Sequence, residues 1–142
     1  MEPQGSGPQL LTEAGMAQTV FIIDDDQSVR EALRAVLESE GCEVRDYGRC
    51  EDFLAEEGDA TTGCLLVDAY LPGLSGLELL DRMQRDGPRL PAIMITGSSD
   101  VQMAVSAMKA GAADFVEKPI GSSDLVSRVR RALQQTTGAG PD

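Results

Sequence analysis

Short, unbroken runs of apolar residues alternate along the chain with segments in which apolar residues recur every three or four positions. An unbroken apolar run is typical of a strand buried on both faces, as in the middle of a parallel sheet. Three such runs, at 19–23, 64–68 and 92–96, predict interior strands. Residues 42–47 alternate only weakly and predict an outer strand, and residues 114–117 predict a fifth strand.

The periodic segments between these runs predict five helices. They lie between Asp26 and Gly41, at 49–57, 76–85 and 100–110, and after Ser122 or Ser123. Asp26 or Ser28 is available to cap the first helix, and Gly111 is expected directly after the fourth. Their apolar faces are expected to be Val29, Leu33, Val36 and Leu37; Phe53 and Leu54; Leu77, Leu80 and Met83; Val101, Ala104, Val105 and Met108; and Leu125, Val129, Ala132 and Leu133.

Strands and helices that alternate through short loops predict an α/β fold, a doubly wound five-stranded parallel sheet with five helices. Right-handed crossovers place the carboxyl ends of all the strands on one edge of the sheet. The strand order 2-1-3-4-5, as in flavodoxin-like folds, would make the three most apolar strands neighbours. Residues 1–18 show no periodicity and are expected to form a mobile tail, followed by one domain at 19–135 and a tail or linker start at 136–142.

The composition narrows the class of function. A net charge of −12 argues against direct binding to nucleic acid or to an anionic membrane. The chain has neither an apolar run of membrane-spanning length nor a secretory signal, so we expect a cytoplasmic protein. The three cysteines have no CxxC spacing and are expected to be reduced thiols. The absence of histidine excludes Ser-His-Asp and Cys-His pairs and most zinc sites.

Charged and hydroxyl residues follow the apolar strands at the predicted carboxyl edge. Asp24 and Asp25 follow the first strand, Asp68 ends the third, Thr96 ends the fourth and Lys118 ends the fifth. Two carboxylates ~4 Å apart repel by about 4 kcal/mol at an effective dielectric constant of ~20, so the group requires a cation. Oxygen ligands with room for water favour Mg²⁺.

Two neighbours of these residues have simpler expected roles. Asp26 is expected to be a helix cap rather than part of the site. Pro119 excludes helical geometry at Lys118, so the lysine can be held pointing inward, and a cis bond between the two residues is plausible.

Taken in order, these motifs closely resemble the receiver domains of two-component response regulators. The resemblance covers about Val20 to Leu133 and includes Asp24-Asp25, the loop from Asp68 through Leu71-Pro72 to Gly76, Thr96-Gly97 and Lys118-Pro119. The sequence from Thr96 to Pro119 is most similar to the FixJ-type branch of this CheY-like family. That branch usually continues into a DNA-binding helix-turn-helix domain, so the sequence leaves open a lone receiver or part of a longer regulator.

The resemblance implies a phosphorylation switch that serves transcriptional regulation. A partner sensor histidine kinase would phosphorylate Asp68, with Mg²⁺ held by Asp25, Asp68 and the backbone carbonyl of Tyr70, and by Asp24 largely through water. Lys118 would neutralise charge on the phosphoryl group. Thr96 would bind a phosphoryl oxygen. Phe115 would be the switch aromatic residue, whose side chain moves together with Thr96. The only activities implied are Mg²⁺-dependent self-phosphorylation from a phosphodonor and slow autodephosphorylation.

The resemblance also implies which residues control the lifetime of the acyl phosphate and which surface transmits the signal. Tyr70 and Ser98 occupy the positions that border the approach of water to the acyl phosphate, and bulky Tyr70 is expected to lie over the crevice and slow hydrolysis. The fourth helix, fifth strand and fifth helix are expected to favour a homodimer after phosphorylation. Their outer faces are expected to present Met103, Ala107, Lys109, Glu117, Arg128 and Arg131.

Other functions fit the sequence less well. A flavodoxin needs a phosphate-binding loop after the first strand, where this chain has three aspartates that would repel phosphate. A haloacid dehalogenase-type phosphatase needs a second aspartate two residues after the first, and that position is Tyr70. A receiver-like interaction module that works without phosphorylation is the alternative that remains open.

Overall fold

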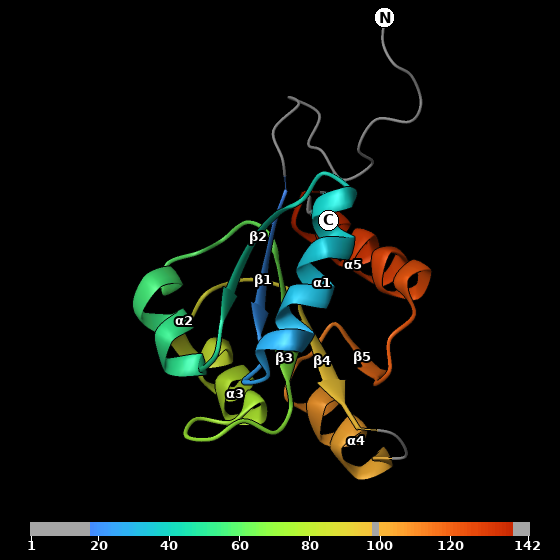
Figure 1. Ribbon diagram of the computed structural model, residues 1–142. Coiled ribbons are helices and arrows are strands. Elements are labelled where there is room, and N and C mark those ends of the chain that lie inside the picture. Colours follow the sequence, from blue (N-terminus) through green and yellow to red (C-terminus); the bar gives the residue numbers. More distant parts are fainter. Residues whose placement is uncertain (1–17, 98–99, 138–142) are drawn as a thin grey trace, which may run out of the picture.

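The computed structural model describes residues 18–97 and 100–137 (Figure 1). The described chain forms a five-stranded parallel sheet in the order β2-β1-β3-β4-β5, which confirms the predicted fold class and strand order. The elements are β1 (Thr19–Ile23), α1 (Gln27–Ser39), β2 (Glu43–Tyr47), α2 (Cys50–Glu57), β3 (Cys64–Asp68), α3 (Gly76–Asp86), β4 (Ala92–Thr96), α4 (Val101–Lys109), β5 (Asp114–Glu117) and α5 (Ser122–Thr137).

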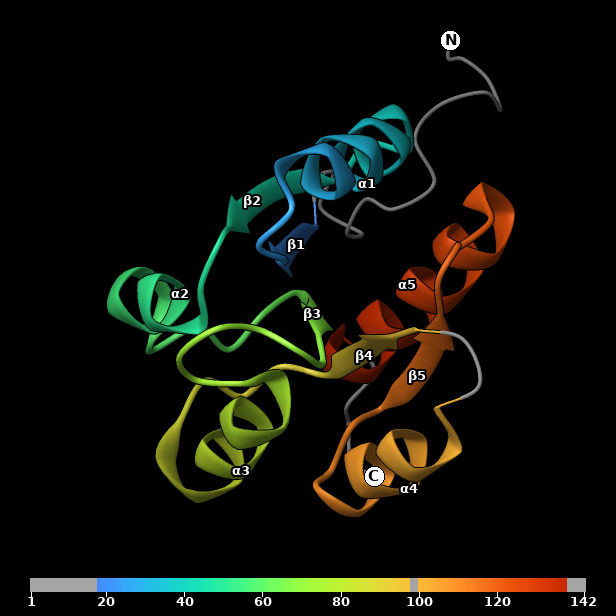
Figure 2. The same cartoon turned by 60° about the horizontal axis from the view of Figure 1, so that its bottom comes forward.

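Helices cover both faces of the sheet, α1 and α5 on one and α2, α3 and α4 on the other (Figures 1 and 2). Alternate residues of each strand therefore belong to two separate apolar cores. Ile22 and Leu66 pack with α1 and α5, whereas Phe21 and Leu65 pack with the other three helices. Every residue of β3 and β4 is buried, as expected for strands covered on both faces. β2 lies at the edge and contains exposed residues, which confirms the predicted outer strand.

The helix ends follow the predicted signals. Asp26 is the N-cap of α1 because its Oδ1 accepts a hydrogen bond from the Ser28 backbone N–H at 2.9 Å. Gly111 follows α4 with a φ of 100°, a left-handed conformation that glycine adopts without strain. The predicted inward residues of α5 (Leu125, Val129, Ala132 and Leu133) are all buried.

Two predicted helix faces were wrong in part. In α3, Leu80 is buried and Met83 packs against the core as predicted, but Leu79 is fully buried where Leu77 was expected, and Leu77 is only partly buried. In α4, Ala104 and Ala107 face the sheet. The expectation that Ala107 lies on the outer surface is therefore wrong.

The larger apolar side chains of α4 lie on its outer side. Val101 is 71% exposed, Val105 49% and Met108 50%. Alanine side chains are short and let the α4 backbone approach β4 and β5 closely, whereas the larger side chains would hold it away. The three exposed residues, which we call the α4 apolar stripe, recur at helical spacing.

The three cysteines are free and buried, in agreement with the prediction of reduced thiols. Burial raises the pKa of Cys42 to about 11 and that of Cys50 to about 12, so both thiols are protonated near neutrality. In residues 18–97 and 100–137, no helix is both long and apolar enough to cross a membrane.

Candidate phosphoacceptor and metal site

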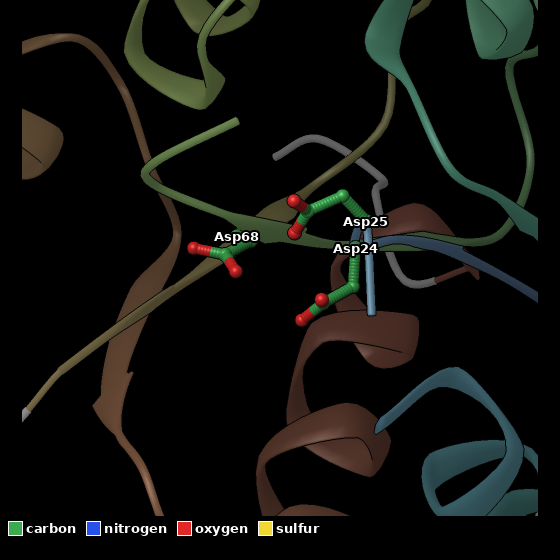
Figure 3. A group of neighbouring side chains, drawn as sticks. All are labelled: Asp24, Asp25 and Asp68. Atoms are coloured by element: carbon green, nitrogen blue, oxygen red, sulfur yellow. The ribbon is translucent and has the colours of Figure 1, made fainter. Parts of the chain in front are cut away.

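Three carboxylates meet where β1 and β3 end (Figure 3). These strands are neighbours, with Ile23 opposite Val67, so Asp24 and Asp68 occupy the next positions along them. One oxygen from each of Asp24, Asp25 and Asp68 lies within 4.8 Å of the others. The topology thus brings together the three acidic residues that the sequence singled out. Oxygen donors so close together suit a hard divalent ion.

Asp24 is the buried member of the group, with 0% exposure. Its Oδ1 accepts a hydrogen bond from the Asp26 backbone N–H at 2.9 Å. Its Oδ2 accepts no hydrogen bond from the described residues and faces Lys118 Nζ as an ion pair at 3.3 Å. Burial, reinforced by the charge of Asp68, raises the pKa of Asp24 despite the opposing effects of the Asp26 N–H and the Lys118 ammonium. A buried acceptor with unused capacity fits a cation site.

Asp68 is held from two sides at the end of β3. The Tyr70 backbone N–H donates to Oδ1 at 3.0 Å, and Lys118 Nζ donates to Oδ2 at 3.1 Å. Burial alone would lower the pKa of Lys118, but Asp68 and Asp24 outweigh it and raise that pKa, so the side chain is an ammonium. Asp68 is 8% exposed, so a small part of its surface reaches solvent. The Lys118–Pro119 bond is cis, as the sequence allowed.

Asp25 and Asp26 have different surroundings from Asp24. Asp25 is exposed, and no residue in the described part of the chain holds its carboxylate by a hydrogen bond. This carboxylate is consequently free to bind an ion that enters from solvent. Asp26 is occupied in capping α1, as expected.

The loop after β3 brings the start of α3 against the Asp68 backbone. A Cβ on Gly76 would lie 2.4 Å from the Asp68 carbonyl oxygen, so only glycine permits this approach. Gly73 has a φ of 75°, and the Glu51 carboxylate fills the space beside it and accepts the Leu74 N–H at 3.0 Å. The glycines of the sequence motif therefore shape the loop that runs from Asp68 to the start of α3.

The predicted switch residues are Thr96, the last residue of β4, and Phe115, within β5. Thr96 is fully buried, and its hydroxyl donates to the Gly97 carbonyl oxygen at 3.1 Å. Phe115 is partly buried against the core formed with α2, α3 and α4. The Lys118 N–H donates to the Thr96 carbonyl at 2.8 Å, which fixes these two strand ends to each other. Ser98 lies outside the described residues.

Tyr70 is 58% exposed, but its hydroxyl is anchored. It donates to Oδ2 of Asp100, and Oδ1 of Asp100 caps α4 by accepting the Met103 N–H at 3.1 Å. The carboxylate raises the pKa of the Tyr70 phenol by accepting its hydrogen bond. Since β3 and β4 are neighbours, the side chain spans from the loop after β3 to the start of α4. Asp100 was missed because its position before an apolar helix indicates only a cap.

Comparisons with known proteins identify relatives of this chain. A model of the response regulator receiver domain matches residues 20–130. The transcriptional regulatory protein FixJ of Azorhizobium caulinodans is 41% identical over 85% of this chain and 57% of its own length. The response regulator protein TodT of Pseudomonas putida is 37% identical over 83% of this chain and 52% of its own. This chain thus spans about half the length of the curated relatives it matches.

Solved structures show the same similarity. Full-length FixJ from B. japonicum superposes with a TM-score of 0.80 at 37% identity, over 86% of this chain and 60% of that one. The receiver domain of NtrX from Brucella abortus superposes with a TM-score of 0.75 at 35% identity, over 81% of this chain and 98% of that one.

Proposed function

The chain belongs to the response regulator receiver domain family, and from that premise we propose that Asp68 accepts a phosphoryl group from a sensor histidine kinase. One observation carries the proposal. The Asp68 carboxylate lies 3.1 Å from the Lys118 ammonium and forms one acidic group with Asp24 and Asp25. A nucleophilic carboxylate that adjoins both a fixed cation and a group of cation ligands suits phosphoryl transfer.

The donor proposed is a phosphohistidine on the partner kinase, since this chain has no histidine. An Asp68 oxygen attacks phosphorus while the phosphorus–nitrogen bond breaks, and the imidazole nitrogen keeps the bonding electron pair. The product is an acyl phosphate on Asp68. Lys118, already directed at Asp68 Oδ2, is placed to neutralise charge on the phosphoryl oxygens.

The acidic group fits Mg²⁺, which is proposed as the cofactor. Asp25, Asp68 and the backbone carbonyl of Tyr70 would hold the ion, with Asp24 acting largely through water. The buried Oδ2 of Asp24, which accepts no hydrogen bond from the described residues, and the exposed carboxylate of Asp25 support this assignment. When bound, the ion would supply positive charge opposite the transferring phosphoryl group.

The signal is proposed to leave the site through Thr96. Its hydroxyl would exchange the Gly97 carbonyl for a phosphoryl oxygen, and Phe115 would follow it inward. The resulting change in α4, β5 and α5 would favour a homodimer. The exposed α4 apolar stripe (Val101, Val105 and Met108) supports this choice of surface, since apolar area of this kind is lost from water on pairing.

The proposed domain limits are a tail at 1–18, the receiver at 19–135 and a tail or linker start at 136–142. The relatives named above are transcriptional regulators and response regulators about twice as long as their match to this chain. We therefore propose that the receiver serves transcriptional regulation, either as a lone receiver or within a longer regulator that carries a DNA-binding domain. A module that works without phosphorylation is not favoured, because the complete Asp, Thr and Lys set is present.

Labelling with acetyl phosphate tests the proposed function. The expected result is one phosphoryl group per chain with Mg²⁺ and none when a chelator removes the ion. Labelling that is insensitive to the chelator would contradict the role of the acidic group. Absence of labelling in the presence of Mg²⁺, both from acetyl phosphate and from a phosphorylated kinase, would favour the phosphorylation-independent module.

A further inference from the structure

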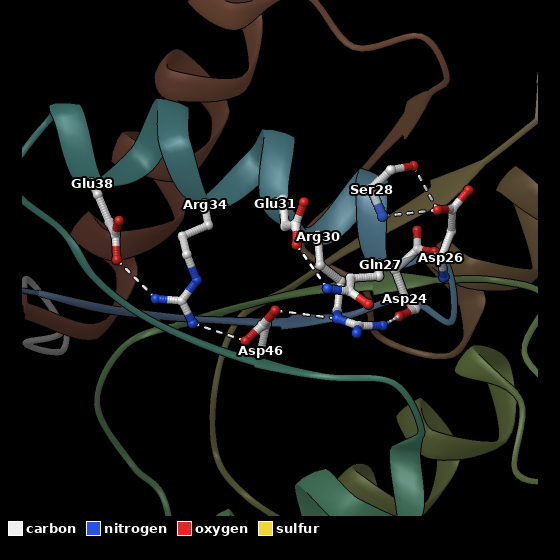
Figure 4. Close-up of polar contacts among 9 residues, drawn as sticks. All are labelled: Asp24, Asp26, Gln27, Ser28, Arg30, Glu31, Arg34, Glu38 and Asp46. Atoms are coloured by element: carbon white, nitrogen blue, oxygen red, sulfur yellow. Dashed lines mark hydrogen bonds and ion pairs between the residues drawn. The ribbon is translucent and has the colours of Figure 1, made fainter.

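Arg30, on the second turn of α1, holds the backbone at the acidic pair (Figure 4). Its Nη1 donates to the Asp24 backbone carbonyl oxygen at 2.6 Å, and its Nε donates to Asp46 Oδ2 at 3.2 Å. The Arg30 side chain is only 18% exposed, so both bonds are shielded from water. A hydrogen bond from a guanidinium is stronger and more directional than one from a neutral donor.

The carbonyl that Arg30 holds belongs to the peptide unit joining Asp24 to Asp25. A peptide unit is planar, so fixing its carbonyl also fixes the direction in which the chain enters Asp25. Asp24 is held at its other backbone group as well, because its N–H donates to the Tyr47 carbonyl at 3.1 Å. No hydrogen bond within the described residues holds the Asp25 carboxylate itself. Its placement beside Asp68 therefore depends on the orientation of this peptide.

Asp46 in turn fixes the Arg30 guanidinium. Asp46 lies on β2 opposite Ile22, and its Oδ1 accepts a second hydrogen bond from Arg34 Nη2 at 2.8 Å. Burial alone would raise the pKa of Asp46, but Arg34 and Arg30 outweigh it and lower that pKa, which keeps the carboxylate ionised. Arg34 also pairs with Glu38 at 2.8 Å, and Figure 4 marks no hydrogen bond or ion pair between Arg34 and Asp24.

We propose that Arg30 is a positioning residue for cation binding. Held by Asp46, it sets the Asp24–Asp25 peptide so that the Asp25 and Asp68 carboxylates can share one divalent ion. The inference rests on the proposed function for the presence of that ion, and it gives the positively charged Arg30 a role in the binding of a cation.

The sign of the effect separates positioning from simple electrostatics. Removing a positive charge close to a cation site would tighten cation binding by Coulomb's law. Removing a group that orients the ligands would instead weaken it, typically by 10- to 100-fold for residues that support metal ligands. The two accounts of Arg30 thus predict changes in opposite directions.

The test is calorimetric titration of the full chain with Mn²⁺ and Mg²⁺, without a phosphodonor. Arg30→Met, which keeps an unbranched apolar side chain but removes the guanidinium donors, should raise the Kd by about tenfold or more. Arg34→Met is the matched control, because it breaks a bond to the same Asp46 without touching the Asp24 carbonyl. Its Kd should stay within about twofold of the wild type if the effect belongs to Arg30. Circular dichroism melts establish that each variant is folded at the titration temperature.

Arg30→Lys provides a second variant that keeps the charge. A lysine offers a single point donor instead of a fork, so this variant should bind the ion more tightly than Arg30→Met but less tightly than the wild type. Unchanged or tighter binding by Arg30→Met, or equal weakening by Arg34→Met, would overturn the inference. If the wild type binds the ions but is not phosphorylated, the proposed function fails while the Kd comparison still decides the role of Arg30. If the wild type binds neither ion, both fail.

Discussion

The lifetime of the acyl phosphate on Asp68 is predicted to depend on the side chain of Tyr70. Hydrolysis requires water to attack phosphorus opposite the Asp68 oxygen, in line with the bond that breaks. The Tyr70 backbone N–H is bonded to Asp68, and its hydroxyl is anchored to Asp100 at the start of α4. The ring is therefore tethered at both ends, near the carboxyl edge of β3 and β4, where this water must enter.

The expected magnitude follows from the tether. A hydrogen bond contributes about 0.5–1.5 kcal/mol net. If the tether must break for water to enter, losing about 1 kcal/mol would speed hydrolysis about fivefold. Tyr70→Phe removes only the hydroxyl and should shorten the lifetime by about this factor. Tyr70→Asn also removes the ring and adds a carboxamide that can orient water, so its lifetime should be shorter still.

The assay follows decay after the donor is removed. Protein is labelled with acetyl phosphate at fixed Mg²⁺, desalted, and sampled over time by intact mass. Asp100→Ser serves as the partner variant, because serine can still cap α4 through the Met103 N–H but lacks the second acceptor for Tyr70. The double variant Tyr70→Phe with Asp100→Ser should decay no faster than either single variant. An unchanged decay rate in Tyr70→Asn would show that Tyr70 does not control hydrolysis.

The remaining predictions concern stability and signalling. Mg²⁺ at 100 times its Kd should stabilise the wild type by about 2.7 kcal/mol in urea denaturation, and Asp25→Asn should lose most of this gain. Because folding raises the pKa of Asp24, its ionisation costs stability as the pH rises through that pKa. Asp24→Asn should therefore stabilise the metal-free protein by about 1 kcal/mol at neutral pH, and urea melts should show this advantage shrinking as the pH falls. Phosphorylation should convert monomer to dimer in sedimentation. Thr96→Ala should be labelled but stay monomeric, as should Val105→Glu, and an equal mass with and without the phosphoryl group would exclude the dimer switch.

The parts of the fold and site that the sequence predicts correctly depend on local patterns. Strands β3 and β4 are apolar throughout because both faces are covered, and that property is visible in the chain itself. In a parallel sheet with right-handed crossovers, the ends of such strands meet at one edge. Asp24, Asp68 and Lys118 could be brought together by this argument alone, and the structure places them within ion-pair distance.

The features that the sequence could not predict depend on side chains that reach between elements. Periodicity gives the apolar positions of α4 but does not show which of its two apolar faces contacts the sheet. The alanine face contacts the sheet because its short side chains allow the helix to approach closely. The bond of Tyr70 to Asp100 joins residues 30 positions apart, and that of Arg30 to Asp46 joins residues 16 apart. Such contacts depend on the angles of loops and helices, which no local sequence pattern specifies.

Intact mass measurement of the wild type and Asp68→Asn tests the central claim most directly. Both proteins are incubated with acetyl phosphate and Mg²⁺, and their far-ultraviolet circular dichroism is compared to show that the fold is intact. The wild type should gain the mass of one phosphoryl group and Asp68→Asn should gain none, because an amide cannot act as the carboxylate nucleophile. Undiminished labelling of Asp68→Asn would contradict the assignment of Asp68 as the phosphoacceptor.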